Sequence, residues 1–345
     1  MHILRRADII AEIIRGKDRC YKMCAFHIYA ASCVPDGGIY HYLYENGKMR
    51  QISKTAADRP MYLAVADDRI YAVLREPFSE SSNSGLCWWN IDADGNLYGQ
   101  SEIISTGGRC GCHLTVENGC VYVANYLSGS VSMLPEGTVV AHSGSGVDPV
   151  RQEASHVHFV GLTPDRKWLL AVDLGLDAIF MYSQDLRTVR RVEMAAGHGC
   201  RHLAWSEDGQ YCFCVNELAS SLSVLRYIQD GLVLTDTVSV LPSGYCGSNT
   251  AAAIRVAGER IYISHRGCDQ IVMLTHRDGT LTAPTFTDAG GKSPRDINLI
   301  QDILLCANES SDCITAFRRT EDGLRPMDMR ISIPKPLCIV CSDKS

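Results

Sequence analysis

Short apolar runs alternate with polar turns along the chain, and one such unit occurs five times. Each copy has an apolar strand, a polar turn that opens on Asn, Asp or His, and a second apolar strand that begins six residues after that anchor. The copies read VYVANYLSGSVSM from residue 121, LLAVDLGLDAIFM from 169, CFCVNELASSLSV from 212, IYISHRGCDQIVM from 261 and LLCANESSDCITA from 304. Helical periodicity is missing between them, so the pattern predicts strands joined by tight turns.

The spacing of the copies predicts the fold. Successive anchors at Asn125, Asp173, Asn216, His265 and Asn308 lie 48, 43, 49 and 43 residues apart, which is the period of a β-propeller blade. Two weaker copies, HIYAASCVPDGGIYHY from residue 27 and IYAVLREP from residue 70, raise the number to seven. We therefore expect residues 1–345 to form one all-β domain, a seven-bladed propeller of four-stranded antiparallel blades.

The two ends of the chain lie outside the clear repeats. The first copy lacks an innermost strand, and the strand-like stretch 331–341 has no partner in the last copy. Pairing between the two would close the ring and remove exposed strand edges. Within residues 1–20, five isoleucines fall roughly on one helical face, which favours a short amphipathic helix only slightly over an extra edge strand.

Composition narrows the range of partners and locations. The net charge of −6 and the lack of long Lys or Arg runs argue against nucleic acid as a partner. No stretch approaches the roughly 20 apolar residues that span a bilayer, and nothing resembles a secretory signal. Many of the 16 cysteines occupy core-like strand positions, and only Cys338 and Cys341 have a CxxC spacing. Reduced thiols in a cytoplasmic protein are therefore expected, without metal sites.

Candidate chemistry comes from the repeat register. The innermost strand of a blade starts at the central channel, so equivalent first positions converge there. Counting back from each anchor gives Met61, Cys112, His158, Arg201, Ala252 and Arg295. The positions directly after the anchors give a second set, Tyr126, Leu174, Glu217, Arg266 and Glu309. His156 lies two residues before His158, on the same face of an extended segment.

Each of these residues could have a purely structural role instead of a role in a functional site. A single His or Arg at a strand end usually bonds a neighbouring group, and Glu217 and Glu309 could pair with Arg201 and Arg295 near a solvated channel, where ion pairs contribute only about 0–1 kcal/mol. Convergence favours a site instead. Cations, a carboxylate and imidazoles at equivalent inner positions of several blades are costly to desolvate unless they pair or bind something.

Five strings in order then suggest a family. They are HVH at 156 with TPDRKW and VDLGLD, GCRHLAW at 199 with VNEL, ISHRG at 263, GGKSPR at 290, and AN at 307. Together they resemble the seven-bladed lactonase family, which includes propeller-type 6-phosphogluconolactonases and fungal carboxy-muconate lactonizing enzymes. The resemblance runs from about residue 27 to 341. It implies an enzyme with its site at the channel mouth and no cofactor.

The resemblance also implies roles for single residues. The GxRH string matches Arg201, the VNEL string Glu217, the SxRG string Arg266, and the HxH string His156 or His158. The chain departs from the family at four positions where Pro, Asn, Glu and Gln are common: it has Cys200, His265, Ala253 and Glu309. These departures leave the substrate less defined than the lactone chemistry.

The predicted function is hydrolysis of a sugar δ-lactone, as by a 6-phosphogluconolactonase of the pentose phosphate route. Glu217, His156 or His158 would act as base and Arg201 would stabilise the carbonyl oxyanion. A clamp for the anionic lactone would come from Arg266 and Arg295 with Lys292, and Glu309 would also contact substrate. Two alternatives remain: a cycloisomerase that acts on a muconate-like dicarboxylate, and a non-catalytic propeller that only binds partners.

Overall fold

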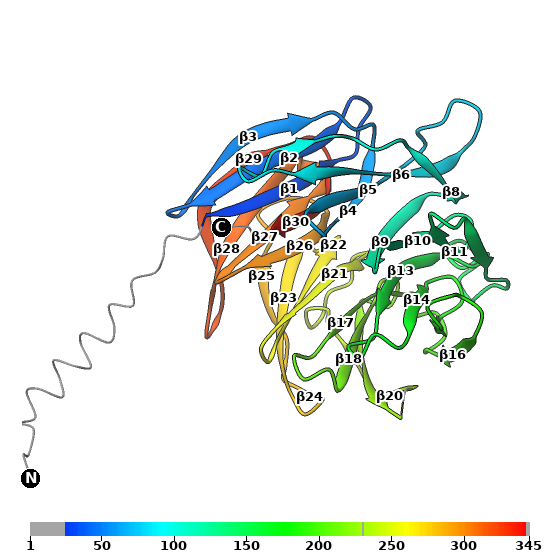
Figure 1. Cartoon of the computed structure of the whole chain (residues 1–345). Helices are drawn as coiled ribbons and strands as arrows, with labels where there is room; N and C mark the ends of the chain where they lie inside the picture. Colours follow the sequence, from blue (N-terminus) through cyan, green and yellow to red (C-terminus); the bar gives the residue numbers. More distant parts are fainter. Residues whose placement is uncertain (1–24, 230, 343–345) are drawn as a thin grey trace, which may run out of the picture.

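The computed structural model describes residues 25–229 and 231–342, which form seven antiparallel sheets around a central channel (Figure 1). The seven innermost strands contact one another in succession around that channel. The predicted all-β, seven-bladed propeller is confirmed. The predicted helix or strand within residues 1–20 lies outside the described residues.

Each blade is numbered here from its place in the ring. Blade 1 contains β1 (Phe26–Ser32), β2 (Gly38–Glu45), β3 (Lys48–Thr55) and β30 (Pro336–Ser342). Blade 2 contains β4 (Pro60–Ala66), β5 (Arg69–Leu74), β6 (Asn83–Ile91), β7 (Leu97–Tyr98) and β8 (Ile104–Arg109). Blade 3 contains β9 (Gly111–Glu117), β10 (Cys120–Asn125), β11 (Ser130–Leu134) and β12 (Thr138–Ala141). Blade 4 contains β13 (Val157–Leu162), β14 (Leu169–Asp173), β15 (Ala178–Tyr182) and β16 (Val189–Glu193).

In the remaining three blades the first strand along the chain is the innermost one. Blade 5 contains β17 (Cys200–Trp205), β18 (Tyr211–Asn216), β19 (Ser221–Ile228) and β20 (Gly231–Ser239). Blade 6 contains β21 (Thr250–Ala257), β22 (Arg260–Arg266), β23 (Gln270–Arg277), β24 (Thr280–Leu281) and β25 (Thr285–Asp288). Blade 7 contains β26 (Pro294–Ile300), β27 (Ile303–Asn308), β28 (Cys313–Thr320) and β29 (Gly323–Ser332), with a short 3-10 helix at Glu309–Ser311.

The C-terminal strand closes the ring. β30 is the innermost strand of blade 1 and pairs antiparallel with β1, with Ala30 opposite Ile339 (Figure 1). The closure predicted from sequence is confirmed, but its boundary was wrong. Ile331 belongs to β29, the outer strand of blade 7. Pro334 follows that strand and cannot donate a ladder hydrogen bond, so a turn separates β29 from β30.

The core lies between neighbouring blades. Alternating inward residues of adjacent sheets form successive apolar clusters, such as the one that joins Ile28 and Tyr42 of blade 1 to Leu305 and Ile314 of blade 7. No disulfide joins the 14 cysteines of the described part of the chain to one another, and many of them pack within these clusters. No group of metal-ligating side chains was found among the described residues. None of their helices has the length and apolarity needed to cross a bilayer.

One irregularity recurs around the channel. In six blades the pairing of the innermost strand with its neighbour skips the second residue of that strand, and in blade 6 it skips Ala252 and Ala253. The skipped residues are Met61, Cys112, His158, Arg201, Arg295 and Leu337. Such a β-bulge leaves one residue unpaired and turns its side chain out of the ladder. With Ala252 of blade 6, the ring has seven bulged positions. Six of them are those predicted from the repeat register, and Leu337 of the closing strand is the seventh.

Candidate active site

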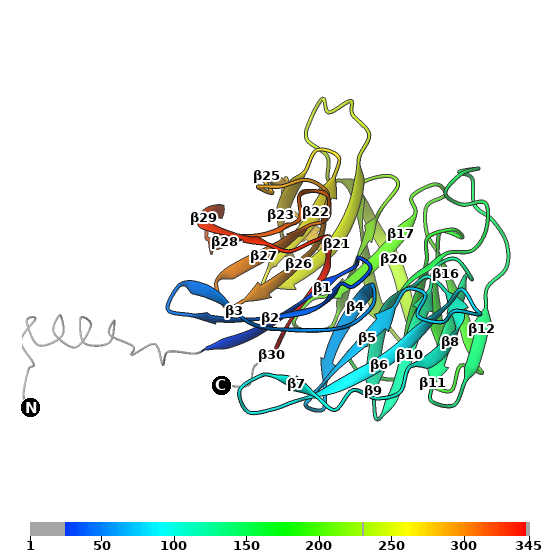
Figure 2. The same cartoon turned by 90° about the horizontal axis from the view of Figure 1, so that it is seen from above.

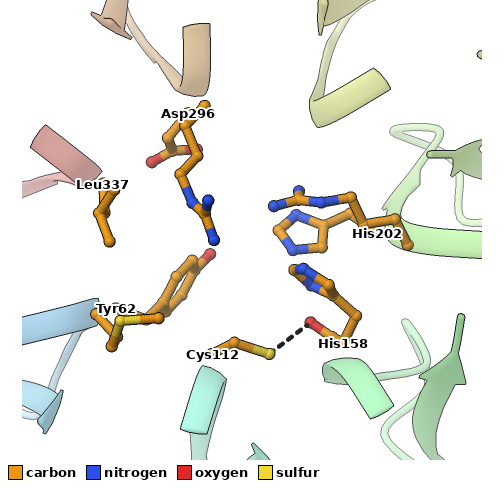
Figure 3. A pocket seen from close by; sticks show the side chains of 9 residues that line it. Tyr62, Cys112, His158, His202, Asp296 and Leu337 are labelled. Carbon is orange, nitrogen blue, oxygen red and sulfur yellow. Dashed lines mark hydrogen bonds between the residues drawn. The ribbon is translucent and has the colours of Figure 1, made fainter. Parts of the chain in front are cut away.

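The bulged residues line a pocket at the centre of the ring. Its walls are Met61, Tyr62, Cys112, His158, Arg201, His202, Arg295, Asp296 and Leu337. Figure 3 shows the labelled side chains converging from different blades. The enclosed volume is about 10 Å³, which holds about one water molecule. A substrate larger than this would therefore occupy the mouth and place only one small group in the pocket.

Glu217 is the centre of a cluster of guanidinium groups beside this pocket. It directly follows β18 and is buried. Its Oε2 accepts from Arg201 Nε at 2.9 Å and lies 2.8 Å from Arg266 Nη2, while its Oε1 accepts from Arg151 Nη2 at 2.6 Å. Three guanidinium groups thus share one carboxylate, which leaves an excess of two positive charges.

This arrangement fixes the protonation of Glu217. Burial alone would raise the pKa of its carboxyl, but the charges of Arg266, Arg201 and Arg151 outweigh burial and hold the pKa well below its usual range. Glu217 is therefore a permanent carboxylate and a weak base. Both Arg201 and Glu217 have side chains only 3% exposed. The expectation of a weak ion pair at a solvated channel was wrong, because the pair is buried.

Arg201 also faces the pocket. Its Nη1 donates to the Ala252 carbonyl at 2.6 Å, and within residues 25–229 and 231–342 its Nη2 has no hydrogen-bond partner. Burial and the charge of Arg266 lower the pKa of Arg201, yet a guanidinium stays protonated at neutral pH. Its remaining N–H groups are available to a ligand oxygen.

Arg295 and Lys292, both predicted to hold an anionic group, lie in different surroundings. Arg295 lines the pocket and donates from Nη1 to Glu309 Oε2 at 3.1 Å. Glu309 also lies 3.8 Å from the ammonium of Lys335. Lys292 is 75% exposed and pairs with Asp269 at 3.1 Å, and it is not among the residues that line the pocket.

The two histidines of the HxH string, His156 and His158, also differ in their surroundings. His158 lines the pocket, and its buried Nδ1 has no hydrogen-bond partner among the described residues. Burial, and then the charge of Arg201, lowers the pKa of His158 well below its ordinary value despite Glu217. His156 stacks on Tyr126 with ring centroids 4.4 Å apart, and its nitrogens contact Glu153 and the Tyr126 carbonyl. Of these two histidines only His158 lines the pocket, so it is the better candidate for a base.

Several residues of the site were missed at the sequence level. His202 lines the pocket beside His158, with ring centroids 5.1 Å apart, and its Nε2 is buried without a partner in the described chain. Tyr62 and Asp296 line it as well. These three directly follow bulged positions, so the same register could have found them. Arg151 lies in an insertion without any repeat, and only its contact with Glu217 reveals it.

Comparison with known proteins gives the family. The model of the seven-bladed β-propeller lactonases matches residues 27–341, which is nearly the whole chain. The chain belongs to this lactonase family. The resemblance inferred from the five strings is thereby confirmed.

Relatives of this lactonase-family propeller match it along most of their length. An uncharacterized protein of Staphylococcus saprophyticus is 26% identical over 88% of this chain and 94% of its own. A Bacteroides fragilis structure, provisionally assigned as a 6-phosphogluconolactonase, is 24% identical with a TM-score of 0.84 and covers 94% of this chain and 100% of that one. The periplasmic gluconolactonase PpgL of Pseudomonas aeruginosa is 23% identical with a TM-score of 0.83, over 92% and 99%. At these identities, the two structures establish the shared fold.

Proposed function

We propose that this lactonase-family propeller hydrolyses an anionic sugar δ-lactone, with 6-phosphogluconolactone as the first substrate to test. One observation carries the proposal: a neutral imidazole, His158, and two guanidinium groups, Arg201 and Arg295, face the same pocket. The surplus positive charge around Glu217 favours a substrate that carries an anionic group. A place in the pentose phosphate route, in the cytoplasm, is part of the same proposal.

The geometry supplies the groups that lactone hydrolysis needs. The lactone carbonyl would enter the pocket and accept a hydrogen bond from Arg201, which stabilises the oxyanion as it forms. His158 takes a proton from water while the water oxygen attacks the carbonyl carbon. The ring C–O bond then breaks, and the imidazolium returns its proton to the departing ring oxygen. The product is the open-chain hydroxy acid.

Glu217 acts through Arg201 in this mechanism. Its carboxylate holds the Arg201 Nε at 2.9 Å and so fixes the orientation of the guanidinium toward the carbonyl oxygen. The same carboxylate does not suit the cycloisomerase alternative, in which an acid must protonate an alkene carbon. Three arginines keep Glu217 deprotonated, so it has no proton to donate.

The dependence of the rate on pH is the first test. A base must be neutral, and the pKa of His158 lies well below the ordinary value of about 6.5 because of burial and Arg201. The catalysed rate is therefore expected to stay level from pH 8 through 6.5 and to fall only in more acidic solution. The measurement is pH-stat titration of the acid released, with the spontaneous rate subtracted. A midpoint at or above pH 6.5 would contradict the assignment.

Substitution separates the candidate bases. His158→Gln is expected to lower kcat/KM for the lactone by about 10² or more, the usual contribution of a positioned base. His156→Gln should cost much less, because His156 is held against Tyr126 and Glu153. His202→Gln tests the neighbouring imidazole, and a larger loss there than at His158 would transfer the role to His202. If the wild-type protein accelerates no lactone above buffer, the non-catalytic alternative is favoured.

A further inference from the structure

The connection 142–156 between β12 and β13, here called the strap, carries Arg151 to the active-site cluster. In Figure 2 the strap and the β20–β21 connection project from the same side of the ring. Arg151 Nη2 donates to Glu217 Oε1 at 2.6 Å and to the Tyr126 hydroxyl at 3.4 Å. Tyr126 in turn lies edge-on to His158, with ring centroids 5.5 Å apart. Tyr126 therefore links Arg151 to the proposed base.

Buried polar contacts hold the strap in one conformation. His142 at its start contacts Asp173 Oδ2 at 2.6 Å and the Tyr182 hydroxyl at 2.9 Å. Gln152, fully buried, donates to the Leu174 carbonyl at 2.8 Å and to Asp177 at 2.7 Å. A strap fixed on both sides of Arg151 presents its guanidinium without a large ordering cost when a ligand binds.

The backbone next to Arg151 is also fixed by its own turn. Asp148 Oδ1 accepts from the backbone N–H groups of Val150 at 2.9 Å and Arg151 at 3.0 Å. The amide oxygen of Gln152 accepts from the N–H groups of Val147 and Asp148. These hydrogen bonds lie within the strap and fix the backbone position of Arg151.

Arg151 is not needed to neutralise Glu217. Arg201 and Arg266 already contact Oε2 of that carboxylate. The side chain of Arg151 is 37% exposed, against 3% for Arg201 and 17% for Arg266. Within the described chain its Nε and Nη1 have no hydrogen-bond partner. Arg151 thus combines a fixed position, surplus charge and unused donors at the solvent side of the cluster.

We propose that Arg151 is a specificity-determining residue, which binds the phosphate or carboxylate substituent of the lactone at the pocket mouth. The inference rests on the proposed lactone hydrolysis and extends it to the substrate class. A guanidinium forms charge-assisted hydrogen bonds with such oxyanions, and a neutral sugar lactone offers no counterpart. Arg151 therefore selects anionic lactones over neutral ones.

Kinetics with three lactones tests the selectivity. Arg151→Gln is expected to lower kcat/KM for 6-phosphogluconolactone at least tenfold more than for glucono-δ-lactone, mainly through KM. A glucarolactone, which carries a carboxylate, shows whether either oxyanion suffices. Arg187→Gln is the matched control, because Arg187 is 86% exposed and forms an ion pair with Asp185 in the connection between β15 and β16, away from the pocket residues. Equal losses for charged and neutral lactones in Arg151→Gln would overturn the proposal.

A binding measurement separates this inference from the proposed activity. Isothermal titration is expected to show that wild-type protein binds 6-phosphogluconate more tightly than gluconate, and that Arg151→Gln loses at least tenfold of this preference. Arg151→Lys should keep part of it, because the charge remains. A preference that persists unchanged in Arg151→Gln would refute the role of Arg151. Failure of the wild type to hydrolyse any lactone would instead refute the proposed activity.

Discussion

A chain that ends at Lys335 is expected to lose its cooperative unfolding transition or to unfold at a far lower temperature. The deletion removes β30, the innermost strand of blade 1, and leaves β1 with an unpaired edge at the channel. It also removes Leu337, Cys338 and Ile339 from three apolar clusters. Truncating one buried Leu or Ile side chain to Ala costs about 2–5 kcal/mol, so the summed loss approaches the typical total stability of about 5–15 kcal/mol.

Differential scanning calorimetry checks this result. A chain that ends at Ser342 keeps the whole of β30 and is the control, which should unfold like the full-length protein. If the chain that ends at Lys335 unfolded at the same temperature as this control, closure of the ring by β30 would contribute nothing to stability.

Glu217→Gln is expected to lower the free energy of unfolding by about 3–5 kcal/mol, the usual cost of removing one partner from a buried ion pair. The substitution leaves Arg151, Arg201 and Arg266 close together without their shared carboxylate. Glutamine also presents an amide N–H₂ group to guanidinium groups that have only donors. Denaturant unfolding measures the change.

The same variant should lose lactone hydrolysis by at least tenfold at a temperature where it remains folded, because Arg201 is no longer oriented toward the carbonyl oxygen. Glu259→Gln is the matched control, since Glu259 pairs with Arg277 on the surface, where the two side chains are 58% and 80% exposed. Its unfolding free energy should change by less than about 1 kcal/mol. A Glu217→Gln protein as stable as this control would show that the cluster does not depend on its carboxylate.

Much of this molecule follows from the sequence because a propeller repeats one local unit. The blade period, the strand alternation and the orphan strand at the C-terminus are all properties of neighbouring residues along the chain. The repeat also carries the register, so His158, Arg201 and Arg295 were placed at equivalent positions of three blades, and the structure puts all three in one pocket. The bulge that turns them into the channel recurs at the same step of each repeat.

Other features depend on contacts between blades that the sequence pattern does not encode. The charges of three arginines outweigh burial and keep Glu217 a carboxylate, so His158 rather than Glu217 is the proposed base. His156 and His158 belong to one string, yet His156 stacks on Tyr126 whereas His158 lines the pocket. Arg151 reaches Glu217 from an insertion with no counterpart in the other blades. The sequence alone therefore determined the fold and the positions that face the channel, because both repeat with the blade. Only the tertiary structure decided burial and protonation, on which the proposed roles rest, because these depend on desolvation and on charges brought together from distant parts of the chain.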